Sequence, residues 1–244
     1  QSLEDAGIDS TGVILDAKRP EDLPTLALIL NTIKNERSIY YFPGVNESLS
    51  AEALLQSKPL LQEVANNQGF LLLSLEMPMA TAAFAIEMAD ELGLRVMLDP
   101  GGQPPEDSID FSPLFKYPIF LLKPNAEEAG RLTGIPVTDF ASAGDAADRL
   151  LARNVSHLLI THGAQGAYAF TPEGRWHIPA PDLPNSPHAE STGCGDQVLA
   201  VLCAEMLRSQ PFAKACRKAV CAGSLQYVQQ GRAPIFPDHP GFSV

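Results

Sequence analysis

The stretch ESTGCGDQVLAVLCAEML (residues 190–207) places two glycines and an aspartate directly before an apolar helical pattern. This pattern predicts a buried helix that begins near Gly195 or Asp196. The first N–H groups of a helix have no partner within it and carry the positive end of its dipole, and Gly193 and Gly195 let a ligand approach the backbone. Such a turn can hold an anion, while the Asp196 carboxylate can accept the proton of a hydroxyl that attacks a phosphoryl group.

Two other interpretations of this stretch compete with the anion turn. A nucleophilic Cys194 would need glycine two residues before it and two residues after it, but Thr192 and Asp196 stand there, which disfavours a nucleophile elbow. A capped helix, in which Asp196 only favours the dipole, explains the isolated motif at least as well. Other segments of the chain must therefore decide between an anion site and a simple cap.

The segment FLLKPNAEEAGRLTG follows a predicted strand and spaces Asn125 and Glu128 three residues apart. An asparagine N-cap followed by this glutamate forms a capping box. The same side chains lie near a strand's carboxyl end, where open α/β sheets bind ligands, and their oxygens can order a hydrated Mg²⁺. The two interpretations are compatible.

Two further motifs follow predicted strands. In LLITHGAQGAYAF, the residues Thr161, Gly163 and Gly166 predict either a plain hairpin turn or a loop that lies against nucleotide phosphates. In LLLSLEMP, Glu76 ends an apolar strand and must face solvent or bind a polar group, because an unpaired buried carboxylate is costly. Sugar hydroxyls are suitable partners, and an exposed Glu76 without a function is the alternative.

The chain has 244 residues, 45% hydrophobic content and a net charge of −12, which is typical of a globular protein and disfavours nucleic-acid binding. It has no apolar run long enough to predict a membrane span. Four cysteines without C-x-x-C pairs disfavour zinc and indicate reduced thiols in the cytoplasm. The absence of Walker and G-x-G-x-x-G motifs argues against P-loop kinases and dinucleotide dehydrogenases.

Strands and helices are expected to alternate along most of the chain, which predicts one α/β domain over residues 1–244 with a mostly parallel sheet flanked by helices. We expect strands at residues 25–33, 37–42, 70–75, 95–98, 119–122, 158–161 and 167–170, and helices at 80–92, 126–132, 142–153, 196–208 and 212–229. The first two strands should pair antiparallel, as part of a small β lid over residues 24–46.

Seven segments in order, GID…TLALIL, ERSIYYFPGVN, LLSLEMP, LLKPNAEEAGRLTG, LLITHGAQGAY, STGCGD and QGRAPIFP, resemble the ribokinase-like PfkB carbohydrate kinases along nearly the whole chain. The resemblance implies an ATP-dependent kinase of this fold, in which Asp196 is the catalytic base. It also implies that Gly193, Cys194 and Gly195 form the anion hole.

The same resemblance implies roles for the other motifs. Asn125 and Glu128 would help to organise Mg²⁺ and phosphate. The nucleotide contacts would come from Thr161, Gly163, Gly166 and Asn125. Glu76 would touch the sugar, with Asn46 of PGVN near the same site.

The chain departs from the family pattern at several positions. Glu190 stands where aspartate is usual, and Gln197, Val198 and Val201 replace a phenylalanine and small residues after the base. Ile235 occupies a position that is often polar near a monovalent-cation site, which leaves K⁺ activation open. The family's first strand and Gly-Gly sugar-binding segment are not found here, so we expect the domain to be N-terminally incomplete.

Two functional hypotheses follow. The first is an ATP-dependent kinase of a small ribose-like sugar, with a nucleoside as another possible substrate, which works in the cytoplasm as a homodimer joined through the lid. The second is a catalytically degraded member that serves as a binding or scaffolding protein. The first is favoured because the base, the anion turn and the N-x-x-E pair are all present.

Overall fold

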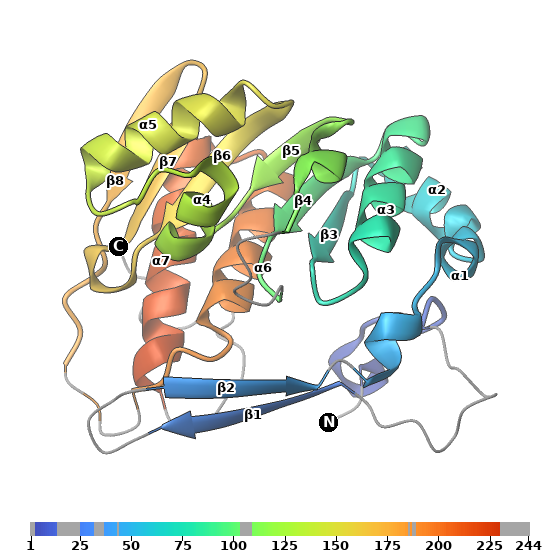
Figure 1. The fold of residues 1–244 in the computed structure, drawn as a ribbon, viewed down its shortest axis with the longest axis horizontal. Coiled ribbons are helices and arrows are strands. Elements are labelled where there is room, and N and C mark those ends of the chain that lie inside the picture. The colour runs from blue at the N-terminus through green and yellow to red at the C-terminus, as the bar shows by residue number, and fades with distance from the viewer. Residues whose placement is uncertain are drawn as a thin grey trace.

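A computed structural model describes residues 3–13, 25–31, 37–42, 44–102, 109–184, 186 and 189–229. At its centre lies a six-stranded sheet with the strand order β3-β4-β5-β6-β7-β8 (Figure 1). The strands from β3 to β6 are parallel neighbours, and β7 and β8 extend the sheet as antiparallel strands. In chain order the six strands are Phe70–Ser74, Arg95–Asp99, Ile119–Leu122, Val155–Thr161, Ala167–Thr171 and Gly174–Ile178.

Helices cover both faces of the sheet (Figure 1). One face carries α3 (Met79–Glu91), α4 (Ala126–Thr133) and α5 (Phe140–Leu151), and the other carries α6 (Cys194–Leu207) and α7 (Phe212–Val228). Two short helices, α1 (Ala51–Leu55) and α2 (Lys58–Asn66), lie beside α3 and β3. Short 3-10 helices occupy Glu4–Ala6, Gly44–Ser48, Ser112–Phe115 and Gly163–Gln165.

The central strands are buried on both faces. In β4, Val96 and Leu98 belong to the core beneath α3, α4 and α5, whereas Met97 packs in the core beneath α6 and α7. All three side chains are at most 1% exposed. Because successive residues of a strand point to opposite faces, an unbroken apolar run fills both cores. The strand ends are therefore held firmly by two layers of helices.

A separate two-stranded sheet is formed by β1 (Leu26–Asn31) and β2 (Arg37–Phe42), which pair antiparallel as expected. Its register places Leu28 opposite Tyr40 and Ala27 opposite Tyr41. In Figure 1 this pair lies below the main sheet, on the side toward which the arrowheads of β3 and β4 point. We call β1 and β2 the lid. Parts of the predicted lid segment, residues 24, 32–36 and 43, lie outside the described residues.

The predicted strands and helices are all present, with ends shifted by a few residues. Helix α5 begins earlier than predicted because Asp139 accepts the N–H of Ser142 as its N-cap. Within the described residues, the sequence analysis did not predict α1, α2, β8 or the four short 3-10 helices. In β8, the sequence GRWHI mixes polar and apolar residues, because this edge strand buries only part of its surface. The short α1 and α2 have no fully buried residue, so neither carries a long apolar stripe.

Candidate active site

The carboxyl ends of β5 and β6 bring two of the predicted motifs together. Asn125, just after β5, forms an isolated parallel β-bridge with Thr161, the last residue of β6. The Thr161 N–H donates to the Pro124 carbonyl at 3.0 Å. The predicted metal-organising residue and the predicted nucleotide residue are therefore neighbours at one edge of the sheet, where open α/β sheets bind ligands.

The predicted capping box at the start of α4 is confirmed. Asn125 Oδ1 accepts the Glu128 N–H at 2.8 Å, and Glu128 Oε2 accepts the Asn125 N–H, also at 2.8 Å. The second carboxylate oxygen, Oε1, lies toward the β4 end, where a Cβ built on Gly101 would be 3.4 Å away. One oxygen of Glu128 is thus used structurally, and the other faces the loop after β4.

The electrostatics around Glu128 suit a cation. Burial raises the pKa of the Glu128 carboxyl, and the nearby Asp99 carboxylate raises it further, against the opposing influence of the Asn125 N–H bond and of Lys123. A carboxylate whose ionisation is disfavoured by burial and by a neighbouring negative charge is stabilised in its charged form by a bound divalent cation. Mg²⁺ is commonly held by one or two protein carboxylates together with substrate phosphates, so this oxygen set fits it.

The start of α6 has the shape expected of an anion turn. Gly193 is the N-cap, with a left-handed φ of 81°. The Cys194 N–H donates to the Ser191 carbonyl at 3.2 Å, and the Gln197 N–H donates to the Gly193 carbonyl at 2.9 Å. Between them, the N–H groups of Gly195 and Asp196 belong to the first turn, which has no acceptors within the helix. The Asp196 side chain is exposed, beside these groups.

Glu190 holds the turn before α6 in place through two hydrogen bonds. Its carboxylate accepts the Thr192 N–H at 3.1 Å, and its own N–H donates to the Tyr227 carbonyl near the end of α7 at 2.9 Å. The residue that replaces the usual aspartate therefore still shapes the turn before α6. These contacts tie the anion turn to the body of the fold.

Sequence reasoning missed two charged residues next to this turn. The Lys123 Nζ forms an ion pair with Asp99 Oδ2 at 2.7 Å, with side chains 4% and 14% exposed. A Cβ built on Gly195 would lie 3.1 Å from Lys123 Nζ and 3.9 Å from Asp99 Oδ2. The signal was available, because LDPGG and LLKP each end a buried strand with a charged residue, as LLLSLE does at Glu76.

The lid and the end of β3 surround Glu76, whose side chain is exposed. Asn46 donates from Nδ2 to the Glu76 carbonyl at 2.9 Å, so the two predicted sugar-binding residues are neighbours. Partial burial raises the pKa of the Tyr41 hydroxyl, and the charges of Glu76 and Glu47 add to the rise. Tyr41 of β2 thus lies near the Glu76 carboxylate, a relationship that the sequence did not predict.

The loop after β6 is a hairpin turn, which is one of the two alternatives expected. Gly163 begins its 3-10 helix with a φ of 51° and has open space where a Cβ would be. Gly166 is different, because a Cβ there would overlap the Ile178 carbonyl oxygen. Gly166 is therefore required for close packing on the end of β8, and nucleotide contact by Thr161, Gly163 and Gly166 stays a prediction.

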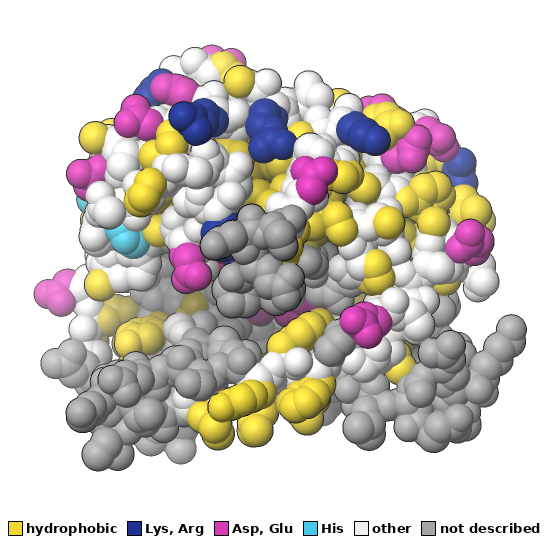
Figure 2. Space-filling view, viewed as in Figure 1, with side chains coloured by type: hydrophobic (Ala, Val, Ile, Leu, Met, Phe, Trp, Pro, Cys, Tyr) yellow, Lys and Arg dark blue, Asp and Glu magenta, His cyan; other side chains and the backbone are white. Residues whose placement is uncertain are grey.

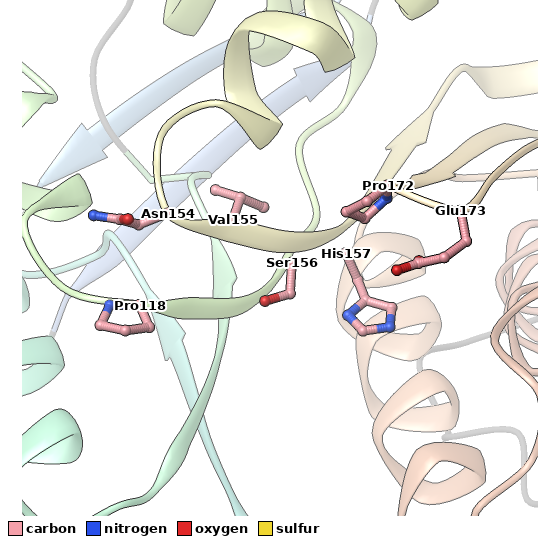
Figure 3. Close-up of a pocket in the computed structure, with 7 residues that line it drawn as sticks. All are labelled: Pro118, Asn154, Val155, Ser156, His157, Pro172 and Glu173. Atoms are coloured by element: carbon pink, nitrogen blue, oxygen red, sulfur yellow. The ribbon is translucent and has the colours of Figure 1, made fainter.

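A separate hollow lies at the opposite edge of the sheet (Figure 3). It is lined by the residues before β5, by the start of β6 and by the β7–β8 turn, namely Pro118, Asn154, Val155, Ser156, His157, Pro172 and Glu173. Its His157 ring packs between Phe120 and Phe212, with centroids 4.5 and 4.8 Å away. Burial lowers the pKa of His157, which fits a packed neutral ring. The hollow is separated from the site by the length of β6.

Three further expectations concern a monovalent-cation site, a membrane span and a metal cluster. Ile235, on which the K⁺ question depended, lies outside the described residues. Within the described ranges, no helix combines the length and the apolar character that crossing a bilayer requires. The described part of the chain also holds no cluster of three or more His, Cys, Asp or Glu side chains suited to a metal ion. A metal ion held by the described residues would therefore have fewer than three such protein ligands and would also bind substrate oxygens.

The chain is similar in sequence to two known sugar kinases. Over 240 residues the chain is 28% identical to ribokinase of Arabidopsis thaliana, an alignment that covers 96% of this chain and 60% of that protein. It is 27% identical over 243 residues to deoxyribokinase of Salmonella typhi, which covers 100% of this chain and 75% of that protein. The chain thus spans less than two thirds of the plant enzyme.

The fold has a counterpart among solved structures. It resembles the structure of Arabidopsis thaliana ribokinase complexed with ribose and ATP, with a TM-score of 0.71 and 22% identity, over 86% of this chain and 65% of that chain. The expected ribokinase-like α/β fold is therefore confirmed. Residues 1–238 match the pfkB family of carbohydrate kinases, and the chain belongs to this family.

Proposed function

We propose that this protein transfers the γ-phosphoryl group of ATP to a hydroxyl of a small ribose-like sugar. The observation that carries the proposal is the exposed Asp196 carboxylate on the first turn of α6, next to the N–H groups of an anion turn. The similarity to a ribokinase and a deoxyribokinase supports a sugar of this size. The solved relative complexed with ribose and ATP supports both substrates.

In the proposed reaction, Asp196 accepts the proton of the sugar hydroxyl as its oxygen attacks the γ-phosphorus. The new P–O bond forms while the bond to the β-phosphate oxygen breaks, which releases ADP. The turn formed by Gly193, Cys194 and Gly195 would surround the negative charge of the transferring group, as an oxyanion hole does, with the N–H groups of the first turn of α6 as donors. The protein's contribution is mainly position and charge.

The remaining predicted residues bind the substrates. Asn125 and Glu128 would hold Mg²⁺, which, when bound, neutralises phosphate charge. The nucleotide would lie over the loop with Thr161, Gly163 and Gly166, beside Asn125. Glu76 and Asn46, which are joined by a hydrogen bond, would receive the sugar hydroxyls. Tyr41 of the lid lies near Glu76 and is a further candidate for sugar contact.

The decisive experiment is the Asp196→Asn substitution in the full-length protein. We expect kcat to fall by roughly 10²–10⁴-fold, since this is the usual contribution of a general base. Asp145→Asn, at an exposed aspartate of α5, serves as the matched control and should retain full activity. Wild-type phosphorylation rates in Asp196→Asn would refute the assigned role.

The second hypothesis is a family member that binds ligands without turnover. A panel of pentoses, hexoses and nucleosides with Mg-ATP separates the two functions. ATP binding without any product on this panel would favour the degraded member, and clear turnover would exclude it. A nucleoside that outperforms every sugar would redirect the proposal to a nucleoside kinase.

The proposal includes an assembly and a location. One face of the lid exposes Leu26, Leu28, Leu30, Tyr40 and Phe42, each 47–54% exposed, and Figure 2 shows apolar side chains gathered along this lower edge. Such a stripe is a candidate contact surface, and we assign it to a homodimer. All four cysteines are free thiols, which supports a cytoplasmic location.

A further inference from the structure

Lys123 carries a positive charge in a place where stability does not explain it. Its side chain is 4% exposed and pairs with Asp99, which is 14% exposed. The loss of hydration largely offsets the attraction within a buried ion pair, and apolar replacements are often equally stable. A requirement for charge at this position is therefore the better explanation.

The position of the Lys123 charge, at the N-terminus of α6, is also unfavourable for stability. The Lys123 ammonium contacts the first turn of α6, since a Cβ on Gly195 would be 3.1 Å from Nζ. A cation is unfavourable at a helix N-terminus, where the dipole is already positive. A bound anion makes this position of the lysine favourable, because the helix dipole and the Lys123 ammonium then both attract the anion. In a chain of net charge −12, a polyphosphate needs such local positive charge.

Asp99 uses both of its carboxylate oxygens. Oδ2 pairs with Lys123, and Oδ1 accepts the Gly101 N–H at 3.1 Å. The Gly101 carbonyl in turn accepts the Leu75 N–H at 3.1 Å. Gly102, with a φ of 100°, packs so closely on Glu76 that a Cβ would lie 2.5 Å from its Cγ. One carboxylate thus connects the anion turn with the strand end that carries Glu76.

We propose that the Lys123–Asp99 pair positions the substrates for phosphoryl transfer. Lys123 places a fixed positive charge next to Gly195 in the anion turn. Asp99 fixes the position of this charge relative to Glu76, on the sugar-binding side of the site. The inference rests on the proposed kinase function. It assigns the alignment of the nucleotide phosphates with the acceptor hydroxyl to two residues for which the sequence analysis predicted no role.

The test replaces the ion pair by a neutral pair of similar size, Asp99→Asn with Lys123→Gln, in the full-length protein. The net charge of the protein is unchanged, and the oxygen of the new amide side chain can still accept the Gly101 N–H. Calorimetry then compares the affinities for ATP and for adenosine, which has the same base but no phosphates. We expect ATP affinity to fall about tenfold or more while adenosine affinity changes less than about threefold, because a buried charge acts strongly at short range. We also expect kcat to fall.

A control lies at the other end of α6, where the buried Glu205 forms ion pairs with Lys218 at 2.9 Å and with Arg208 at 3.0 Å. Glu205→Gln with Lys218→Gln should leave ATP affinity unchanged. If the first double variant does not fold, Lys123→Gln alone removes the same positive charge and should weaken ATP binding but not adenosine binding.

Each outcome has a distinct meaning. Unchanged ATP affinity and kcat in the neutral-pair variant, or equal losses for ATP and adenosine, would overturn the inference while leaving the kinase proposal intact. A wild-type protein that neither binds nor turns over ATP would instead overturn the proposed function, and the inference with it.

Discussion

Asn125 and Thr161 form a single parallel β-bridge just beyond the ends of β5 and β6, although they belong to motifs far apart in the sequence. The bridge extends the sheet by one pairing at its carboxyl edge. It places the predicted metal-organising pair beside the predicted nucleotide loop. The proposed roles of both motifs at one phosphate group require this proximity.

Cys194→Ala should retain activity. The thiol makes a long contact, 3.6 Å from Sγ to the Glu190 carbonyl, whereas the Cys194 N–H shapes the turn by donating to the Ser191 carbonyl. We expect kcat/KM in a sugar phosphorylation assay to stay within about threefold of wild type, because a thiol is only a weak hydrogen-bond donor. Complete loss of activity would instead indicate that the Cys194 thiol acts as a nucleophile.

Gly193→Ala should lose activity beyond its loss of stability. A residue with a Cβ in the left-handed conformation costs about 1–2 kcal/mol, and Gly193 has a φ of 81° with open space around it. Gly134→Ala is the control, because Gly134 ends α4 with a φ of 72° and equally open surroundings. Urea unfolding should show similar losses in both variants, but only Gly193→Ala should lower kcat. Equal kcat values would mean that the turn geometry does not affect the reaction.

Glu128→Gln should stabilise the protein at neutral pH when no Mg²⁺ is present. Burial and the Asp99 charge raise the pKa of Glu128, so the folded state binds its proton more tightly than the unfolded chain does. The stability contributed by this group is full below the usual glutamate pKa of about 4.3 and is lost as pH rises through the raised value. Glutamine can still complete the capping box.

Melting curves across pH measure this effect. The Tm advantage of Glu128→Gln should be largest near pH 7 and should disappear below about pH 4, where wild-type Glu128 is protonated as well. Glu127→Gln, at the exposed neighbouring position, should show no such gain. A Glu128→Gln advantage that is independent of pH would contradict the electrostatic explanation.

Leu28→Lys should separate the proposed homodimer. Leu28 is 48% exposed at the centre of the apolar face of the lid, opposite Tyr40, and a buried unpaired lysine would oppose association. Light scattering after size-exclusion chromatography should show a dimer for wild type and a monomer for the variant. Leu207→Lys, at a similarly exposed leucine on α6, should stay dimeric. A monomeric wild type would rule out the lid assignment.

Much of the fold could be predicted because it depends on local patterns. Unbroken apolar runs identified β3 to β7, and the capping box at Asn125 and Glu128 is encoded by two residues three apart. The glycine turn before α6 was predictable for the same reason, since Gly193 and the helix after it are adjacent in sequence. Strand β8 escaped prediction because an edge strand buries only part of its surface and lacks a continuous apolar run.

The sequence by itself therefore determined the α/β class, the family and the chemical types present at the site. Only the tertiary structure decided which of these groups meet. Lys123 and Asp99 end neighbouring parallel strands, and their pairing beneath Gly195 depends on strand order and on the packing of α6 against the sheet. The charge of Glu76 influences the pKa of Tyr41 only because the lid lies at the carboxyl edge of the sheet. Such contacts join residues distant in the chain, and the burial that holds them arises from the whole fold rather than from any one segment.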